Sequence, residues 1–228
     1  MMIKILIVSP LALENGRGGE ISSMELAAGL NKYYNTTFVH TNIFIGKKLL
    51  TKEVIEAKLN GVKIKTRMKF ATLNISNLVF TFPYPRDLIK FYKIIKKNNI
   101  IYTSCSTFKQ NLMIMFFSLL HRRGKFIVGY RKPLHSDKLF SLYNFKYRLS
   151  ILFFSIFKKR FYHHTLSQNT RKFLCKFYNP KNVVHIVHGI DLSKFIDDGF
   201  TVKLKNILKL VYIGYLDDIH KGVNVLID

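Results

Sequence analysis

Short runs rich in β-branched residues alternate along this chain with longer amphipathic runs, and this alternation constrains the fold more than any other feature. Buried parallel strands that are each followed by a crossover helix produce this pattern. We therefore expect an α/β fold with a Rossmann-like parallel sheet flanked by helices. The expected strands are Ile3–Val8, Thr37–Ile43, Asn99–Thr103, Lys125–Gly129, Val183–Val187 and Leu208–Ile213, and the expected helices are Gly19–Asn31, Arg86–Lys97, Thr107–His121, Leu139–Phe161 and Gln168–Phe177. The segment 51–81 fits neither period clearly.

The chain has 228 residues, enough for one large domain and too few for two nucleotide-binding domains of about 150 residues each. Residues 196–206 are polar and aperiodic, as in a linker, and the strand expected after them is followed by Lys221-Gly222 at the start of a helix. We expect a first domain over residues 1–198. Residues 199–228 would be a linker and the beginning of a second α/β domain.

The chain is strongly basic, with 37 Lys and Arg against 13 Asp and Glu and a net charge of +24. The segment 86–181 holds 21 of these basic residues and two aspartates, hence +19 of the total. Such a field attracts nucleic acid or an anionic membrane alike. No RRM, KH or zinc-finger signature is present, which disfavours a nucleic-acid partner. The longest apolar runs are about half as long as a membrane-spanning helix.

Cysteine and histidine contents argue against a metal or disulfide protein. The two cysteines, Cys105 and Cys175, form no closely spaced pair, which fits a reducing compartment and a cytoplasmic location. His185 and His188 would point to opposite faces of a strand and could not share one ion, so a structural role is favoured for the histidines. We expect no metal and no cofactor, and a hydrolase nucleophile turn is absent from the sequence.

A glycine pair, Gly18-Gly19, stands between the first strand and the first helix. Glycine there lets a ligand approach the backbone, and the free N–H groups of the helix start favour anions. The spacing matches neither a dinucleotide fingerprint nor a P-loop. Ligand binding and a simple tight turn are both open from this motif alone.

Four segments, in order, resemble the glycosyltransferase family 4-like enzymes of GT-B fold. The similar segments are the glycine turn with its Glu-Leu-Ala helix, a strand ending in Ser with its helix, an interdomain Gly-Ile-Asp segment, and a second-domain entry: 10–30, 165–174, 184–195 and 210–227. The resemblance implies transfer of a sugar from a nucleotide-sugar donor to an acceptor, without a metal ion. It assigns substrate binding to Gly18, Gly19, Glu20 and Lys221 and a catalytic role to His135. Tyr215 stands where the family has an Arg.

The family's paired-glutamate motif lies beyond Asp228, so the resemblance covers the acceptor-side half of such an enzyme. From it we expect a fragment or one half of a split enzyme that is inactive without a second chain. The nucleotide, the sugar and the acceptor, a lipid-linked saccharide or another glycan, cannot be read from these residues. An alternative without catalysis stays open: a basic α/β module for nucleic acid or membrane, or an inactive remnant.

Two basic clusters follow apolar runs, Arg122-Arg123 after Leu112–Leu120 and Lys158-Lys159-Arg160 after Leu149–Phe157. Apolar runs with basic ends are typical of segments at an anionic membrane surface. We expect these five basic residues to contact a membrane or the acceptor, which predicts peripheral association with the cytoplasmic membrane face. Buried crossover helices with solvated basic ends explain the same pattern.

Overall fold

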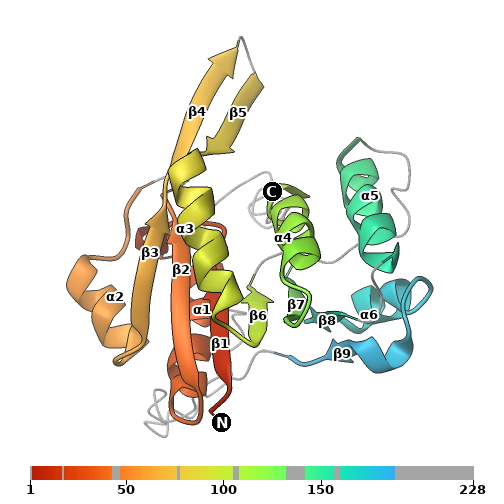
Figure 1. Ribbon diagram of the computed structural model, residues 1–228, viewed down its shortest axis with the longest axis horizontal. Helices are drawn as coiled ribbons and strands as arrows, with labels where there is room; N and C mark the ends of the chain where they lie inside the picture. The colour runs from red at the N-terminus through yellow and green to blue at the C-terminus, as the bar shows by residue number, and fades with distance from the viewer. Residues whose placement is uncertain are drawn as a thin grey trace, which may run out of the picture. The chain divides into compact units, whose positions relative to one another are not determined.

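The computed structural model describes residues 2–16, 18–42, 47–75, 78–104, 108–131, 142–156 and 160–187 (Figure 1). Its elements in chain order are β1 (Lys4–Val8), the 3-10 turn η1 (Leu13–Asn15), α1 (Gly18–Asn31), β2 (Asn35–Thr41), α2 (Lys52–Leu59), β3 (Lys63–Met68), β4 (Phe70–Ile75), β5 (Leu78–Pro83), α3 (Pro85–Lys96), β6 (Ile100–Thr103), α4 (Phe108–Leu120), β7 (Lys125–Tyr130), α5 (Leu142–Ile156), β8 (Phe161–Thr165), α6 (Gln168–Leu174), η2 (Pro180–Asn182) and β9 (Val183–His185).

Seven of these strands form one sheet in the order β3-β2-β1-β6-β7-β8-β9, and every pair in it is parallel. The sheet grows in one direction from β1 to β3 and in the other from β6 to β9, as in a Rossmann fold. The expected α/β class is therefore confirmed. The predicted second domain, with its strand Leu208–Ile213, lies outside the described residues.

Helices cover the sheet according to the right-handed crossover rule. α1 and α2 pack on one face against Ile5, Ile7 and Phe38. α3, α4, α5 and α6 pack on the other face, where Leu6 and Val8 lie in the larger core. Because successive residues of β1 enter opposite cores, both faces of the central strand have to be apolar, and its sequence is an unbroken apolar run.

Two predicted elements differ from the structure. The helix expected over Leu139–Phe161 is α5, which ends at Ile156, and Phe161 begins β8. The ambiguous segment 51–81 contains α2, the edge strand β3 and a hairpin in which β4 and β5 pair antiparallel with each other. The base of this hairpin is closed by Tyr84, whose N–H donates to the Lys69 carbonyl at 3.2 Å.

Within the described residues, no helix is long and apolar enough to cross a bilayer.

Candidate functional site

The strand order reverses between β1 and β6: strands are added on one side of β1 up to β3 and on the other side from β6 to β9. The Ser104 N–H donates to the Val8 carbonyl at 3.0 Å and joins the carboxyl ends of β6 and β1, and the Ser9 N–H donates to the Val39 carbonyl at 2.9 Å and joins the end of β1 to β2. Loops leave a parallel sheet in opposite directions at such a point and leave room for a ligand between them. This carboxyl edge is therefore where a functional site is expected (Figure 1).

The loop between β1 and α1 is fixed before it reaches the glycine pair. The Thr41 hydroxyl donates to the Pro10 carbonyl at 2.7 Å, and the N–H groups of Leu49 and Leu50 donate to the Glu14 carbonyl. Gly16 has φ +61°, and a Cβ atom there would lie 2.8 Å from Cγ of Leu50. Backbone conformation and packing both require glycine at position 16.

Gly18 and Gly19 are in a different situation. They are the first two residues of α1, and a Cβ atom at either would meet no described heavy atom within 4 Å. Neither residue has a positive φ. Neither packing nor backbone conformation therefore requires glycine at these two positions. Because glycine has no side chain, it leaves the space beside the first N–H groups of α1 open. These N–H groups have no acceptor within the helix and favour the binding of an anion.

Arg131 supplies a fixed positive charge at the same place. It follows β7 directly, and its side chain reaches back to α1 and to the end of β6. Nε donates to the Ser104 carbonyl, Nη1 donates to the Ser22 hydroxyl, and Nη2 donates to the Ser23 hydroxyl at 3.2 Å. The Ser23 hydroxyl in turn donates to the Gly19 carbonyl at 2.6 Å, so a continuous chain of hydrogen bonds joins the guanidinium to the glycine pair.

Glu20 lies in the first turn of α1 with only 2% of its surface exposed. A carboxylate in this turn interacts favourably with the helix dipole and stabilises α1. It also reduces the positive potential that the helix start offers to an incoming anion. Among the described residues, Arg131 places a positive charge close to this turn and so opposes the charge of Glu20.

His164, a neutral histidine on β8, lies beside Arg131. Its Nδ1 is 2.8 Å from the Tyr102 hydroxyl and its Nε2 is 3.0 Å from the Ile186 carbonyl, so Nε2–H donates to the carbonyl and the phenol donates to Nδ1. Burial lowers the pKa of His164, the bond to Ile186 opposes this, and the charge of Arg131 lowers the pKa further. Among the described residues of the site, the guanidinium of Arg131 is thus a cation that lies beside a histidine which is neutral near pH 7.

The other predicted site residues do not gather here. Arg122 and Arg123 are exposed in the turn between α4 and β7, where Lys125 N–H donates to the Asn99 carbonyl at the amino edge of the sheet. Arg160 is half-buried, also at the amino edge, and its Nη1 donates to the Ser118 carbonyl at 3.1 Å. His135, Lys158, Lys159 and Lys221 lie outside the described residues, so their predicted roles stay predictions.

Sequence reasoning missed Arg131. A basic residue that directly follows a buried strand was a usable signal, because the carboxyl end of a parallel strand is where ligands bind. The signal was weak, since Arg131 is one of 37 basic residues.

The histidine pair on β8 has two separate local roles. His163 is on the opposite face of the strand from His164, where its ring stacks on Tyr178 with centroids 3.9 Å apart. Its Nδ1 lies 3.3 Å from the Tyr130 hydroxyl, and burial lowers its pKa to about 3. Among the described residues, no three His, Cys, Asp or Glu side chains lie close enough together to hold a metal ion.

No protein-family model matches this chain, and no curated protein matches it. Similar solved structures include a UDP-N-acetylglucosamine 2-epimerase from Listeria monocytogenes, with 12% identity over 80% of this chain and 44% of that one and a TM-score of 0.48. MnaA of S. aureus in a co-structure with UDP gives 17% identity over 89% of this chain and 50% of that one, also with a TM-score of 0.48. A phosphomethylpyrimidine kinase from Clostridium difficile gives 10% identity and a TM-score of 0.37. This chain spans about half the length of the first two proteins.

Proposed function

We propose that this chain is the acceptor-side domain of a glycosyltransferase that moves a sugar from a nucleotide-sugar donor to an acceptor. One observation carries the proposal: Arg131 and the open glycine pair meet at the switch point of a Rossmann-like sheet. The resemblance of four sequence segments to family 4-like glycosyltransferases supports it independently. In this function the switch point binds the phosphate groups of the nucleotide-sugar donor.

The chemistry of sugar transfer explains why a fixed guanidinium is useful there. Negative charge develops on the diphosphate as its bond to the sugar breaks, and a cation that is already oriented stabilises that charge without reorganising. Arg131 uses three of the five N–H donors of its guanidinium on described partners. The remaining two can donate to phosphate oxygens in the bidentate geometry that guanidinium groups favour.

In the proposed function the residues of the site have separate roles. Gly18 and Gly19 would let a phosphate contact the backbone N–H groups. The hydrogen bonds to Ser22 and Ser23 would keep the Arg131 side chain in one conformation. His135 and Lys221 keep the catalytic and phosphate-binding roles that the family resemblance gives them.

Calorimetric titration of the full chain with UDP, UDP-glucose, GDP-mannose and uridine tests this function. We expect binding of at least one nucleotide sugar, no comparable binding of uridine, and at least tenfold weaker binding to Arg131→Gln, because hydrogen bonds to charged groups contribute about 1.5–3 kcal/mol. Arg171→Gln is the matched control: this half-buried arginine donates through Nε to the Val183 carbonyl, away from the switch point.

Two outcomes would contradict the proposal. The first is that no nucleotide binds, or that Arg131→Gln and the wild-type chain bind nucleotide sugars equally well. The second is that a single-stranded RNA binds more tightly than every nucleotide sugar and loses affinity in Arg131→Gln, which would favour the nucleic-acid module.

A further inference from the structure

The side chains of Tyr102 and His164 form a hydrogen-bonded pair that reaches across a strand. Tyr102 is on β6 and His164 is on β8, and β7 lies between these two strands. A Cβ atom at Gly129 of β7 would lie 2.9 Å from the Tyr102 hydroxyl. The missing side chain at Gly129 therefore lets the phenol pass over β7 and reach the imidazole, 2.8 Å away.

This pair lies on the same face of the sheet as the Arg131 side chain. Tyr102 belongs to the core cluster that α1 covers, and Arg131 donates hydrogen bonds to Ser22 and Ser23 of α1. Gly129 is the register partner of His164, and Arg131 follows Gly129 by two residues along the chain. Since residues two apart in an extended segment share a face, Arg131 and His164 are neighbours across two adjacent strands.

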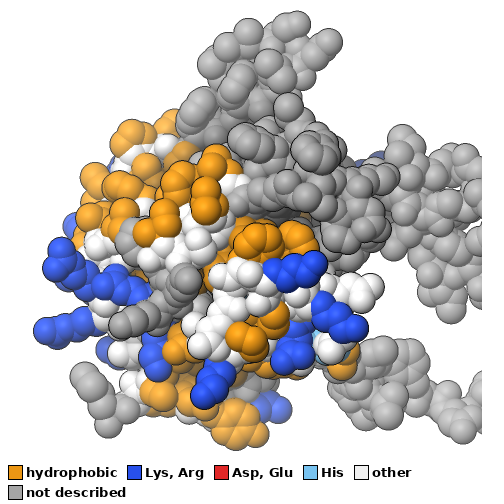
Figure 2. Space-filling view, turned by 90° about the vertical axis from the view of Figure 1, so that its right-hand side faces the viewer, with side chains coloured by type: hydrophobic (Ala, Val, Ile, Leu, Met, Phe, Trp, Pro, Cys, Tyr) orange, Lys and Arg blue, Asp and Glu red, His pale blue; other side chains and the backbone are white. Residues whose placement is uncertain are grey.

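The groups around His164 disfavour a protonated ring. Burial is the main cause of its lowered pKa, the bond to the Ile186 carbonyl opposes this, and the charges of Arg131 and of His185 on β9 lower the pKa further. Among the described residues from 88 to 187 there is no Asp or Glu. Figure 2 views the side where α5 and α6 lie and shows Lys and Arg there, but no described Asp or Glu. On the side of α1 the charged group is Glu20, which is 2% exposed. A bound anion would add the negative charge that favours the protonated ring.

Tyr102 and Ile186 can hold the His164 ring in either protonation state. Nε2–H donates to the Ile186 carbonyl at 3.0 Å in both states. When Nδ1 gains a proton, it donates to the phenol oxygen, and the phenol changes from donor to acceptor. The neighbouring His163 differs, because no described atom accepts a hydrogen bond from its buried Nε2. Of the two adjacent histidines, His164 is thus the one that can change its charge without moving.

We propose that His164 is a second, proton-linked cation of the switch point, which takes a proton from solvent on Nδ1 when the diphosphate of a nucleotide sugar binds at Arg131. This rests on the proposed function, because it requires that ligand. The two negative charges of the diphosphate exceed the single charge of the guanidinium, so binding reverses the field that acts on the ring. The imidazolium then adds a positive charge beside the diphosphate that is present only in the complex.

Calorimetric titration at pH 6 and pH 8, in buffers of different ionisation enthalpy such as MES and bis-Tris, measures the protons taken up on binding. The ligand is UDP-glucose or GDP-mannose, whichever binds. Both are diphosphate diesters without a group that titrates between these pH values, whereas a terminal phosphate titrates near pH 6. We expect uptake of about 0.5–0.8 proton per ligand at pH 6, almost none at pH 8, and about two- to fivefold tighter binding at pH 6, because the ligand returns the pKa of His164 toward its ordinary value.

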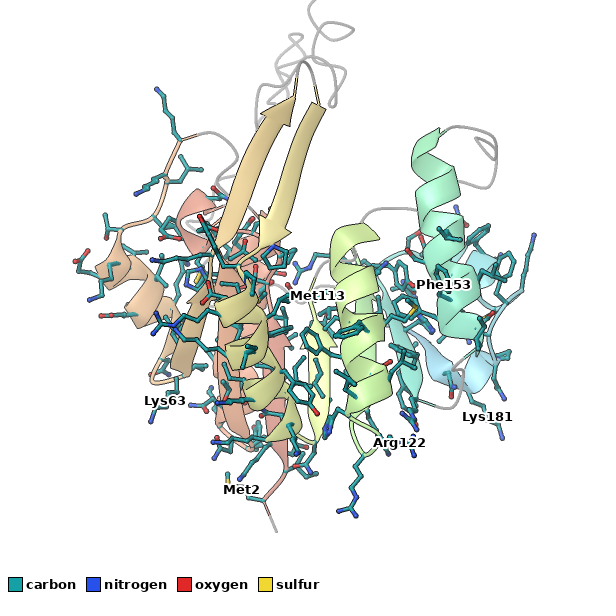
Figure 3. The ribbon with its side chains drawn as sticks, turned by 45° about the horizontal axis from the view of Figure 1, so that its top comes forward. Met2, Lys63, Met113, Arg122, Phe153 and Lys181 are labelled. Carbon is teal, nitrogen blue, oxygen red and sulfur yellow. The ribbon has the colours of Figure 1, made fainter. Side chains whose placement is uncertain are left out.

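His164→Gln should abolish the proton uptake and the tighter binding at pH 6, since its amide can accept from Tyr102 and donate to Ile186 but does not titrate. Two controls should keep both effects. His185→Gln removes the neighbouring histidine on β9, and Arg122→Gln removes a charge at the amino edge, where Figure 3 shows Arg122 pointing away from the protein below the end of α4.

Binding without proton uptake, or equal uptake by His164→Gln and the wild-type chain, overturns this inference and leaves the proposed function standing. If neither nucleotide sugar binds at either pH, the proposed function fails and the inference fails with it. NMR of the histidine rings in the wild-type chain gives a second measurement that requires no variant to fold. The titration midpoint of His164 should move to higher pH by at least about half a unit when the ligand is added, and an unmoved midpoint overturns the inference.

Discussion

The buried imidazole of His163 should make the stability of this chain fall steeply with acid, and replacing it by phenylalanine should remove most of that fall. His163 is 1% exposed, stacks on Tyr178 and lies against Phe154 of α5. No described atom accepts a hydrogen bond from its Nε2. A protonated ring would therefore bury a charge and a donor without an acceptor, which explains why its pKa falls to about 3.

The sign and size of the effect follow from proton binding in the two states. The unfolded chain protonates this histidine near pH 6.5, whereas the folded chain does so only near pH 3. Between these pH values the unfolded state holds the extra proton, so the free energy of unfolding decreases by about 1.4 kcal/mol for each pH unit of acidification. From pH 6.5 to pH 4.5 the loss is about 2 kcal/mol, because the unfolded histidine is already half protonated at pH 6.5, and this is a substantial part of the 5–15 kcal/mol that folded domains have.

Urea unfolding followed by far-UV circular dichroism, at several pH values from 7 to 4, measures this slope. His163→Phe can keep the stacking on Tyr178, and it should lose about 1 kcal/mol at pH 7 with the Tyr130 contact while showing a much shallower pH dependence. His185→Phe, at a half-exposed position, retains His163 and should retain the slope. Parallel pH profiles for wild-type chain and His163→Phe would refute the reasoning, whatever their difference at pH 7.

Two substitutions test the local structure around the site and the hairpin. Gly16→Ala should destabilise the chain by about 2–3 kcal/mol, because φ +61° disfavours an L residue and the Cβ would overlap its neighbours. Gly18→Ala, the control, should be neutral or slightly stabilising. Thermal unfolding should show a Tm lower by about 5–10 °C for Gly16→Ala and no such fall for Gly18→Ala. Asp87→Ala should lower the free energy of unfolding in urea by about 1–3 kcal/mol, because the buried carboxylate accepts a 2.9 Å hydrogen bond from the Lys69 N–H. Lys90→Ala removes a half-exposed ammonium 3.9 Å from this carboxylate and should lower it by well under 1 kcal/mol. Equal losses at Asp87 and Lys90, or at the two glycines, would contradict these assignments.

Hydrophobic period was enough to locate the central strands and most helices. Apart from the terminal residues Lys4, Thr103 and Lys125, β1, β6 and β7 are apolar runs because both faces of each strand are buried, and such runs are visible without any tertiary information. α3 was equally visible, with proline at its first position, an aspartate in its first turn and lysines in its last.

The missed elements lack this signal for physical reasons. β3 is an edge strand, so it carries Lys63, Lys65 and Arg67 where a central strand would carry valine or isoleucine. β8 follows the aromatic end of the preceding run, and one of its buried positions is held by His163, a residue that a period-based reading counts as polar. Its burial depends on tertiary packing against Tyr178, Phe154 and Tyr130, which the sequence pattern does not show.

Only the part of the candidate site that is contiguous in sequence could be predicted. The glycine pair is contiguous in sequence and follows the first strand, so local pattern located it. Arg131 is 109 residues from Ser22 along the chain, and their contact exists because the strand order brings the carboxyl ends of β1, β6 and β7 together. A sequence read without its topology contains Arg131 as one basic residue among many.

The arginines at the two edges of the sheet are held differently. A transfer reaction requires the cation that binds the phosphate to be held at one position. Three hydrogen bonds, to Ser22, Ser23 and the Ser104 carbonyl, orient Arg131 before a ligand binds. Arg122 and Arg123, by contrast, are exposed in a turn at the amino edge. The two edges are separated by strands of four to seven residues among β1, β2, β6 and β7, hence by about 13–23 Å. Arg122→Gln/Arg123→Gln should therefore leave ligand binding at Arg131 unchanged, because sites this far apart without shared partners act independently.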